Sequence, residues 1–439
     1  MVPLGRKTLF KDVPRFLVAQ AGVAFAVGLI AIETGIYLGF IKSTILPIQQ
    51  SRADIWVSAR GMPYFELTIP IRYDSVARAR TVTGVQRAEA LFLKTSAWRG
   101  TNNKLEYIRV IGFDPAGQLW SPGNTPSNEL ARLRAPNSAF VDDSKLGNLS
   151  IDGVGGTGKI GAHTINVVGL THGAQPVVSA TFIFATLRNA KSYLEPAAGT
   201  GTASDTSAAQ SLLDPDELAR YLEAADITRY LEQQGIVPTP KPSPTPTPAA
   251  NVSDDPGTLE PGDDISYVMI QAQPHTDLNA LKGRLTSELR GTAAYTKTEM
   301  EDKTSTYWLK RTNIGFILGL IAIVGLVVGV TVAGQILYTS VVEHISEYGT
   351  LRAIGAPDSL FYAVVAEQAV IMALLGFIPG IVLSAIIGHW AFATRGVIIL
   401  ITPGSAALTL IVITAMCVLS GVFAVQRALR VDPAMVFRA

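Results

Sequence analysis

Four long apolar segments set the first limit on what this chain can fold into. They run from Phe16 to Ile41, from Thr312 to Val342, from about Leu360 to Ile387, and within Gly396 to Gln426. Each can supply the roughly 20 apolar residues that a helix needs to cross a bilayer. The chain is 48% hydrophobic but still 16% charged, which is too polar for a protein buried throughout in lipid. The sequence therefore predicts a membrane protein with a large part outside the bilayer.

Basic residues near the ends of the apolar segments predict the orientation of the chain. Those before the first segment and after the fourth are Arg6, Lys7, Lys11 and Arg15, and Arg427, Arg430 and Arg438. Because cytoplasmic flanks are enriched in Lys and Arg, both termini are expected in the cytoplasm. The first segment is too long for a signal-peptide core, and no small-residue cleavage site follows it, so we expect it to remain as a helix.

These signals give an α+β membrane protein of four transmembrane helices, with a large extracytoplasmic mixed α+β domain between helices 1 and 2. The expected parts are a cytoplasmic N-terminus (1–15), helix 1 (16–41), the external domain (42–311), helix 2 (312–338), a cytoplasmic link (339–358), helix 3 (360–388), helix 4 (403–426) and a cytoplasmic C-terminus (427–439). The expected location is the cytoplasmic, or inner, membrane.

The external region has enough patterned sequence for its own core. Alternating apolar residues predict strands at 54–57, 65–69, 85–93, 105–113, 164–170, 180–184 and 265–272. A helix is expected at 76–82. A second one, at 276–289, carries leucines at helical spacing and can be capped by Thr276 or Asp277.

An insert at about 196–264 differs in composition from the rest of this region. Residues 197–210 are small and polar, 212–234 are charged and helix-prone, and proline takes every second position from Pro238 to Pro248. Alternating prolines favour extended polyproline structure and cannot form a core. We expect a flexible or semi-rigid spacer.

Residue patterns that carry enzyme chemistry are weak in this chain. The stretch from Gly153 to Lys159 resembles a phosphate-binding loop, but Ile160 stands where a Ser or Thr would hold Mg²⁺, so a glycine-rich turn is the better interpretation. The five histidines have no metal-ligand spacing, and the pairs Asp142-Asp143 and Asp263-Asp264 are expected in solvated loops. Cys417 is the single cysteine, and a net charge of +1 argues against nucleic acid as a partner. The sequence predicts no enzyme, no metal site and no cofactor on this chain.

Two glutamates, Glu33 and Glu367, lie within apolar segments. An ionisable residue in a membrane span is a functional candidate because burial of its charge is costly. Each also lies near a span end and can reach the interface, and this plainer interpretation is preferred for both residues.

The polar stretch from Glu343 to Ala356 joins the second and third apolar segments. It contains helix-favouring residues, glycines that allow close backbone approach, and a helix stop at Gly355 and Pro357. Such a link is either a plain connector or a short helix that presses on a partner. The residues assigned to this contact are Glu343, His344, Glu347, Tyr348, Gly349, Leu351, Arg352, Ala353 and Gly355.

Taken together, the sequence resembles the permease subunits of MacB/FtsX-type ABC exporters, and most closely the DevC branch. The matching stretches are 17–26, 108–115, 295–300, Tyr307-Trp308, 314–316, 335–338, His344 and 347–355. The last of these is the most specific. The proline-rich insert departs from the family pattern, as does Ser346, where the broader MacB-like pattern has a basic residue.

The resemblance implies a non-catalytic transport subunit that works with a separate ABC ATPase, on which ATP and Mg²⁺ are bound. It further implies a permease homodimer, docking of the 343–355 helix on the ATPase, a periplasmic adaptor, an outer-membrane duct, and export of a lipid, glycolipid or other hydrophobic substrate. The alternatives are an FtsX-like mechanotransmitter that regulates a cell-wall hydrolase, a lipoprotein-release permease, and a membrane sensor that needs no ATPase.

Overall fold

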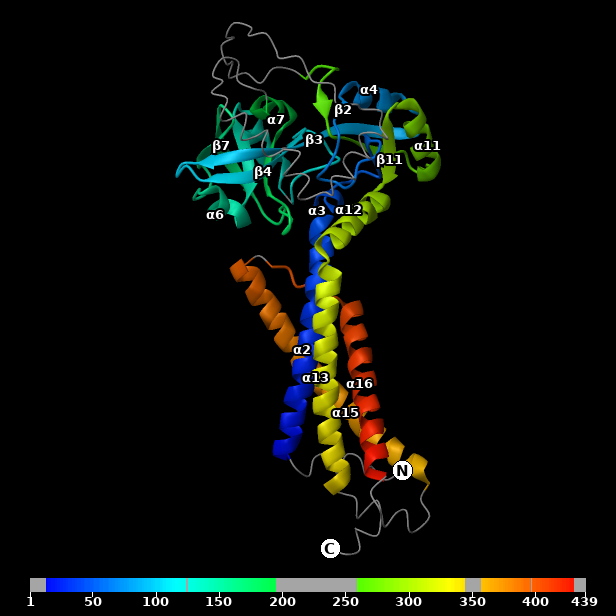
Figure 1. The fold of residues 1–439 in the computed structure, drawn as a ribbon. Helices are drawn as coiled ribbons and strands as arrows, with labels where there is room; N and C mark the ends of the chain where they lie inside the picture. The colour runs from blue at the N-terminus through cyan, green and yellow to red at the C-terminus, as the bar shows by residue number, and fades with distance from the viewer. Residues whose placement is uncertain (1–12, 124, 195–258, 344–356, 396, 430–439) are drawn as a thin grey trace, which may run out of the picture. The chain divides into compact units, whose positions relative to one another are not determined.

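The computed structural model describes residues 13–123, 125–194, 259–343, 357–395 and 397–429 (Figure 1). The chain divides into two compact units. One unit comprises residues 1–42 and 309–439, and the other comprises residues 43–308. The protein is therefore a mixed α+β chain with a helical unit and a large sheet domain, and each is described separately.

The helical unit is built from four long helices: α2 (Val13–Thr44), α13 (Ile314–Glu343), α15 (Asp358–Arg395) and α16 (Pro403–Leu429). Each contains a window long and apolar enough to cross a membrane, at Phe16–Thr44, Ile314–Val332, Phe361–Thr394 and Pro403–Phe423. These four helices correspond to the four apolar segments expected from the sequence.

The contacts at glycines show in which direction the four helices run relative to one another. Gly22 of α2 lies against Val332 of α13, and Gly325 and Gly315 of α13 lie against Leu29 and Tyr37 of α2. Later residues of α2 thus contact earlier residues of α13, so these two helices run antiparallel. Side chains at Gly376 and Gly380 of α15 would meet Val23 and Val27, so α15 runs parallel to α2. Similarly, Gly329 lies against Met416 and Gly334 against Ser420, so α16 runs parallel to α13. The start of α2, the end of α13, the start of α15 and the end of α16 therefore lie at one end of this unit.

One half of the sheet domain alternates strands and helices in the order β1 (Ile55–Ala59), α4 (Asp74–Thr81), β3 (Val85–Gly100), β10 (Tyr267–Ala272), α11 (Leu278–Glu288) and β11 (Thr292–Thr296). The strands lie in the order β11-β1-β10-β3 and all pair antiparallel. This is the split β-α-β topology of ferredoxin-like folds. Apolar side chains of α4 and α11, such as Val76, Ala79, Leu281 and Leu285, pack on one face of this sheet.

The other half is inserted between β3 and β10 and closes into a barrel (Figure 1). Its strands are β4 (Leu105–Phe113), β5 (Ser138–Asp142), β6 (Thr157–Ile160), β7 (His163–Thr171) and β8 (Thr181–Thr186), together with the second part of β3. The pairings β3–β4, β4–β8, β8–β5, β5–β7 and β7–β6 form a ring, and β6–β3 completes it. The strand β3 therefore belongs to both halves.

The barrel encloses its own core. Trp98, Ile108, Val141, Ile165 and Ile183 are among the buried side chains inside the ring. The indole Nε1 of Trp98 donates to the Leu149 carbonyl at 3.0 Å. The helix α7 (Leu187–Leu194) packs against this core through Ala190 and Tyr193.

Short elements complete the domain: α3 (Leu46–Gln49), β2 (Ile71–Arg72), α5 (Ser127–Leu130), η1 (Ala131–Arg134), η2 (Asp143–Lys145), α6 (Leu146–Leu149) and β9 (Asp264–Ile265). The helix α12 (Lys297–Thr312) follows β11 and leads to α13. Asn313 separates the two helices with a left-handed φ of 49°.

One expectation about local structure was wrong, and another was correct over most of its length. The strand expected at 65–69 is a loop with an isolated bridge between Tyr64 and Leu67. Its backbone is satisfied by side chains, because the Phe65 amide donates to Thr304 Oγ1 and the Phe65 carbonyl accepts from the Tyr267 hydroxyl. The strand expected at 265–272 is divided into β9 and β10, and the Ser266 hydroxyl between them bonds the backbone of Leu93.

Candidate functional site

The polar link between α13 and α15 is the segment to which the sequence assigns a partner. Glu343 is the last residue of α13, and α15 begins at Asp358. The assigned residues His344, Glu347, Tyr348, Gly349, Leu351, Arg352, Ala353 and Gly355 lie outside the described residues. Their contact with a partner stays a prediction. The described residues that flank this link, Glu343 and Asp358, lie at the end of the helical unit where α2 begins and α16 ends.

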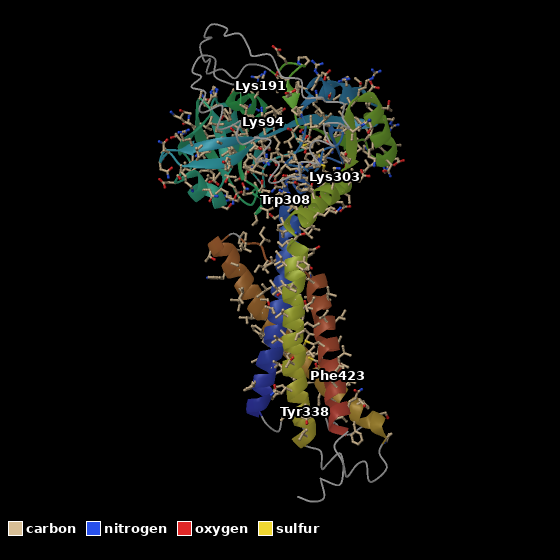
Figure 2. All side chains as sticks on the ribbon, viewed as in Figure 1. Lys94, Lys191, Lys303, Trp308, Tyr338 and Phe423 are labelled. Atoms are coloured by element: carbon tan, nitrogen blue, oxygen red, sulfur yellow. The ribbon has the colours of Figure 1, made fainter. Side chains whose placement is uncertain are left out.

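The helix packing of this unit depends on small residues and few polar contacts. The Ser384 hydroxyl of α15 donates to the Gly380 carbonyl at 2.7 Å and to the Gly28 carbonyl of α2 at 3.3 Å. The Ser420 hydroxyl of α16 donates to the Val330 carbonyl of α13 at 3.1 Å. Small residues let helix backbones approach closely where lipid gives no hydrophobic driving force between helices. Tyr338 and Phe423 mark α13 and α16 in Figure 2.

Glu33 of α2 is buried within the helical unit. It is 6% exposed within the helical unit, and neither carboxylate oxygen has a hydrogen-bond partner among the described residues. Its position relative to a membrane interface stays a prediction. Glu367 of α15 is exposed. Of these two intramembrane candidates, Glu33 is the one for which burial demands an explanation.

The sheet domain joins its first and last segments at one junction. The Lys297 ammonium donates to the carbonyls of Gln49 and Ser51, at 3.1 and 2.6 Å, and its amide donates to the Asp54 carbonyl at 2.9 Å. The neighbouring strands β1 and β11 pair from Ile55 to Ala59. The chain therefore enters and leaves this domain through elements that are hydrogen-bonded to each other.

Aromatic stacking extends this junction along α12. The rings of Tyr64 and Tyr307 stack with centroids 4.0 Å apart, and Trp308 meets Tyr64 edge-on at 5.6 Å. Met300 of the same helix is fully buried in the core, and Figure 2 marks Trp308 on α12. A displacement of α12 would therefore disturb the loop that carries Tyr64 and the core that contains Met300.

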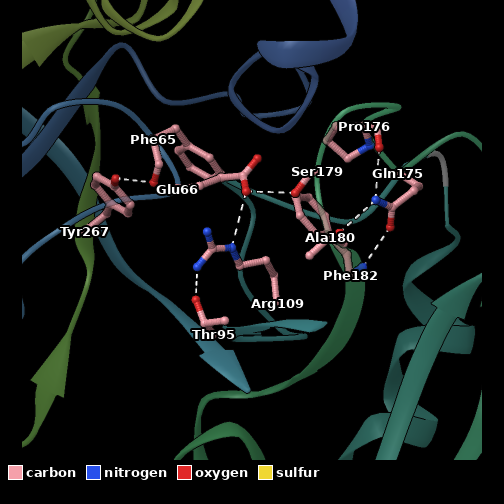
Figure 3. Close-up of polar contacts among 10 residues, drawn as sticks. All are labelled: Phe65, Glu66, Thr95, Arg109, Gln175, Pro176, Ser179, Ala180, Phe182 and Tyr267. Carbon is pink, nitrogen blue, oxygen red and sulfur yellow. Dashed lines mark hydrogen bonds and ion pairs between the residues drawn. The ribbon is translucent and has the colours of Figure 1, made fainter. Parts of the chain in front are cut away.

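A buried ion pair lies behind that loop (Figure 3). Glu66 is 6% exposed and accepts from Arg109 Nε at 3.2 Å and from the Ser179 hydroxyl at 2.8 Å. Arg109 also donates to Thr95 Oγ1. Burial raises the pKa of the Glu66 carboxyl, and the charge of Arg109 and the two hydrogen bonds oppose this shift. The pair joins the 60–67 loop, β4 and the segment before β8.

Sequence reasoning missed this pair because its members are far apart in the chain. Glu66 lay in a segment expected to be a strand, and Arg109 was one polar residue within a strand pattern. The only available signal was the pattern itself, since Arg109 interrupts the apolar residues of 105–113. Lys297 was missed for the same reason.

The motifs considered for enzyme chemistry receive structural explanations. Lys159 lies in the strand β6, so no helix follows the glycine-rich stretch as a phosphate loop requires. A side chain at Gly158 would collide with the Trp98 indole, which explains that glycine. Among the described residues, no group of three or more His, Cys, Asp and Glu side chains could hold a metal.

The expectation that Asp142 lies in a solvated loop was wrong. Asp142 ends β5, is 1% exposed, and accepts from Ser144, from the Thr171 hydroxyl and from the Ala174 amide. Asp263 is also partly buried and bonds Lys191 at 2.9 Å. Both carboxylates hold loops in place, so neither forms a reactive pair with its neighbour.

These features define a chain with four membrane-length helices and a folded domain encoded between the first two. Residues 319–433, which include α15, α16 and the polar link, match the family described as FtsX-like permease C-terminal. This part of the chain is therefore similar to the C-terminal region of FtsX-like permeases.

Curated relatives match over a similar length. An uncharacterized ABC transporter permease of Mycobacterium tuberculosis (strain ATCC 25618 / H37Rv) is 30% identical over 124 residues, which are 27% of this chain and 33% of the relative. A probable export ATP-binding/permease protein of Pseudomonas fluorescens (strain Pf0-1) is 31% identical over 127 residues, 29% of this chain and 20% of the relative. The alignments thus span a third or less of these relatives.

Solved structures with some likeness are the periplasmic region of MacB from Actinobacillus actinomycetemcomitans and the extracellular domain of the noncanonic ABC-type transporter YknZ from Gram-positive bacteria. The first has 9% identity and a TM-score of 0.30, and covers 58% of this chain and 94% of that structure. The second has 10% identity and a TM-score of 0.29, and covers 55% and 99%.

Proposed function

We propose that this protein is the membrane permease subunit of an ABC-type export complex. The observation that carries the proposal is the match of residues 319–433 to the FtsX-like permease C-terminal family, which includes the polar link and the two helices after it. In this proposal a separate ATPase subunit binds ATP and Mg²⁺, and this chain contributes no catalytic residue.

The proposed site of coupling is the link from Glu343 to Gly355, pressed against the ATPase at the cytoplasmic face. Both chain termini would then be cytoplasmic, since α2 begins and α16 ends at the same end of the helical unit as this link. The sheet domain would be extracytoplasmic. Motion of the spans would reach it through the two hydrogen-bonded segments joined by Lys297.

The finer parts of the proposal rest on the sequence resemblance alone. They are the DevC branch, a permease homodimer, an adaptor and outer-membrane duct in a cytoplasmic (inner) membrane, and a lipid, glycolipid or other hydrophobic substrate. An FtsX-like mechanotransmitter, a lipoprotein-release permease and an ATPase-independent sensor remain the alternatives.

The test is a pair of substitutions in the link. Gly355→Trp places a bulky ring in the proposed contact and Glu347→Lys reverses a charge there, and each should weaken ATPase binding by about 1–3 kcal/mol. We expect normal membrane abundance with loss of the copurifying ATPase and of transport-linked ATP hydrolysis.

Matched controls are available in the described structure. Gly319→Trp adds the same ring where nothing lies within 4 Å, and Glu288→Lys makes the same charge reversal at an exposed position of the sheet domain. Both controls should retain the ATPase. Full ATPase binding and hydrolysis in the two link variants would reduce the link to a connector and favour the sensor.

A further inference from the structure

Three basic residues lie at one level of the helical unit, where α2 ends and α13 begins. They are Lys42, Lys310 and Arg311, and all three are exposed. Tyr37 of α2 contacts Gly315 of α13. At 1.5 Å per residue, Lys42 lies about 7.5 Å after this contact and Arg311 about 6 Å before it. Because the two helices run antiparallel, both displacements have the same direction, and the three cations share one level.

The chain supplies no anion close to these cations. No Asp or Glu lies within seven residues of Lys42, Lys310 or Arg311 in the sequence. In the part of the chain that the structure describes, none of the three forms an ion pair. The helix α15 runs parallel to α2 and ends at Arg395, which adds a fourth basic residue at this end of the unit. The local charge is therefore positive.

The same level corresponds to the edge of the membrane-length segments. These segments end at Thr44 in α2 and begin at Ile314 in α13, within four residues of all three cations. Trp390, near the end of α15, is 64% exposed. Exposed tryptophan is typical of the boundary between the hydrocarbon core and the lipid headgroups. The anions present at this depth are headgroup phosphates, so these are the groups that the three cations meet.

A loop of the sheet domain adds an apolar side chain beside the end of α2. The Val177 amide donates to the Ser43 hydroxyl oxygen at 2.5 Å, and Ser43 directly follows Lys42. Val177 is 43% exposed and lies between Pro176 and Val178 in the sequence. Such a side chain loses its contact with water when it enters the headgroup layer, which is favourable. This second feature also fits a lipid surface.

The three cations do not form a single pocket. Successive residues of a helix are rotated by about 100°, so Lys42 lies on the side of α2 opposite Leu29 and Tyr37. Those two residues contact α13. Lys42 is thus directed away from the helix that follows Lys310 and Arg311. Separate lipid molecules around the helical unit would therefore meet separate cations.

We propose that Lys42, Lys310 and Arg311 bind the headgroups of anionic phospholipids in the leaflet on the side of residues 43–308. Each cation would contact a headgroup phosphate, and the absence of acidic residues nearby in the sequence favours anionic lipids over zwitterionic ones. These lipids would be bound around the protein and would not be its transported substrate. The inference rests on the proposed function only in requiring that the four helices span a bilayer.

Native mass spectrometry of the purified full-length protein tests this binding. The protein in detergent is given equal amounts of phosphatidylglycerol and phosphatidylcholine, and the ratio of the two bound lipids is measured. Wild type should favour phosphatidylglycerol. The triple variant Lys42→Gln, Lys310→Gln and Arg311→Gln should lower the ratio by at least about 5-fold, the effect of one cation near a membrane surface.

Two control variants separate charge at this level from other effects. Arg132→Gln with Arg284→Gln and Arg290→Gln removes three exposed cations of the sheet domain and should leave the ratio unchanged. Lys42→Arg with Lys310→Arg keeps the positive charge and should retain the wild-type ratio. If the triple variant does not fold, Lys42→Gln alone should still lower the ratio.

Equal lipid ratios in wild type and in the glutamine variants would overturn the proposal. Inorganic phosphate distinguishes a lipid headgroup from a free anion. Displacement of phosphatidylglycerol by excess phosphate, but not by sodium chloride of equal ionic strength, would show that the cations recognise free phosphate and would also overturn it. Copurification of an ATPase with wild type is a separate measurement, and its failure would contradict the proposed function without changing the lipid ratio.

Discussion

Two buried glutamates show how differently the two units treat a polar group. Glu33 in the helical unit and Glu66 in the sheet domain are each 6% exposed. Glu66 accepts from Arg109 and Ser179, whereas the oxygens of Glu33 have no hydrogen-bond partner among the described residues. Equal burial therefore does not mean equal structural roles. The first glutamate joins three segments of its domain, and the second adds a cost that packing around it must offset.

Glu66→Leu tests this contrast where the expected effect is largest. The substitution leaves Arg109 largely buried without its carboxylate, and breaking a buried pair in this way costs about 3–5 kcal/mol of unfolding free energy. Denaturant unfolding of the purified protein, followed by tryptophan fluorescence, measures the loss.

The double variant Glu66→Leu with Arg109→Met is the informative control. It removes both charges and should recover much of the lost stability, because an apolar pair needs no compensation. Equal destabilisation in the single and double variants would show that shape at this position, and not charge pairing, holds the segments together.

Gly380→Leu probes the packing on which the helical unit depends. A side chain at this position would meet Val27 and the Ala24 carbonyl of α2, so α2 and α15 would have to separate. Overpacking of this kind costs about 1–3 kcal/mol. We expect a lower thermal unfolding temperature in detergent. Gly319→Leu, at a position with nothing within 4 Å, should leave that temperature unchanged. A matching drop in both variants would mean that a larger side chain lowers this temperature wherever it is placed, and that the contact of Gly380 with α2 does not explain the result.

Glu33→Leu should change stability in the opposite direction from Glu66→Leu. Because no described residue bonds the Glu33 oxygens, an apolar side chain loses no contact and avoids the cost of an unsatisfied buried group, about 1 kcal/mol or more. The expected result is an equal or higher thermal unfolding temperature. A clear decrease in this temperature would show that Glu33 makes a stabilising contact, as Glu66 does.

The smallest expected effect concerns a half-buried pair of the sheet domain. Lys282 donates to Glu299 at 2.5 Å, and this hydrogen bond lowers the pKa of Glu299 below its usual value of 4.5. A carboxyl with a lowered folded-state pKa stabilises the fold above its unfolded-state pKa, and this contribution is lost as pH falls through the folded-state value. The stability difference between wild type and Lys282→Met should therefore be small at neutral pH and be lost as pH falls through the lowered pKa of Glu299. A difference that persists at acid pH would assign it to packing of the lysine chain.

Local patterns in the sequence predicted much of the fold. Residues 105–113 are rich in strand-favouring residues and form β4, and Asp277 caps α11 by accepting from the Asn279 amide at 2.9 Å. The apolar segments likewise became α2, α13, α15 and α16. Such elements follow from spacing and capping over a few residues, which is why one sequence suffices to find them.

Long-range pairings could not be predicted in this way. Closure of the barrel depends on β6 meeting β3 some 60 residues away, from Trp98↔Ile160 to Gly100↔Gly158, and no local pattern encodes that register. The Glu66–Arg109 pair and the Lys297 junction likewise join distant segments. The assignment of a partner to residues 343–355 came from a family resemblance, and it remains a prediction.

The junction at Lys297 has a consequence for how such a protein can be assembled from parts. A domain whose first and last segments are bonded to each other can be inserted into a host chain, or removed from it, without pulling the flanking sequences apart. The sheet domain of residues 43–308 meets this condition, since Lys297 bonds the carbonyls of Gln49 and Ser51. Recombination at its paired ends could therefore exchange this domain between membrane proteins as one unit.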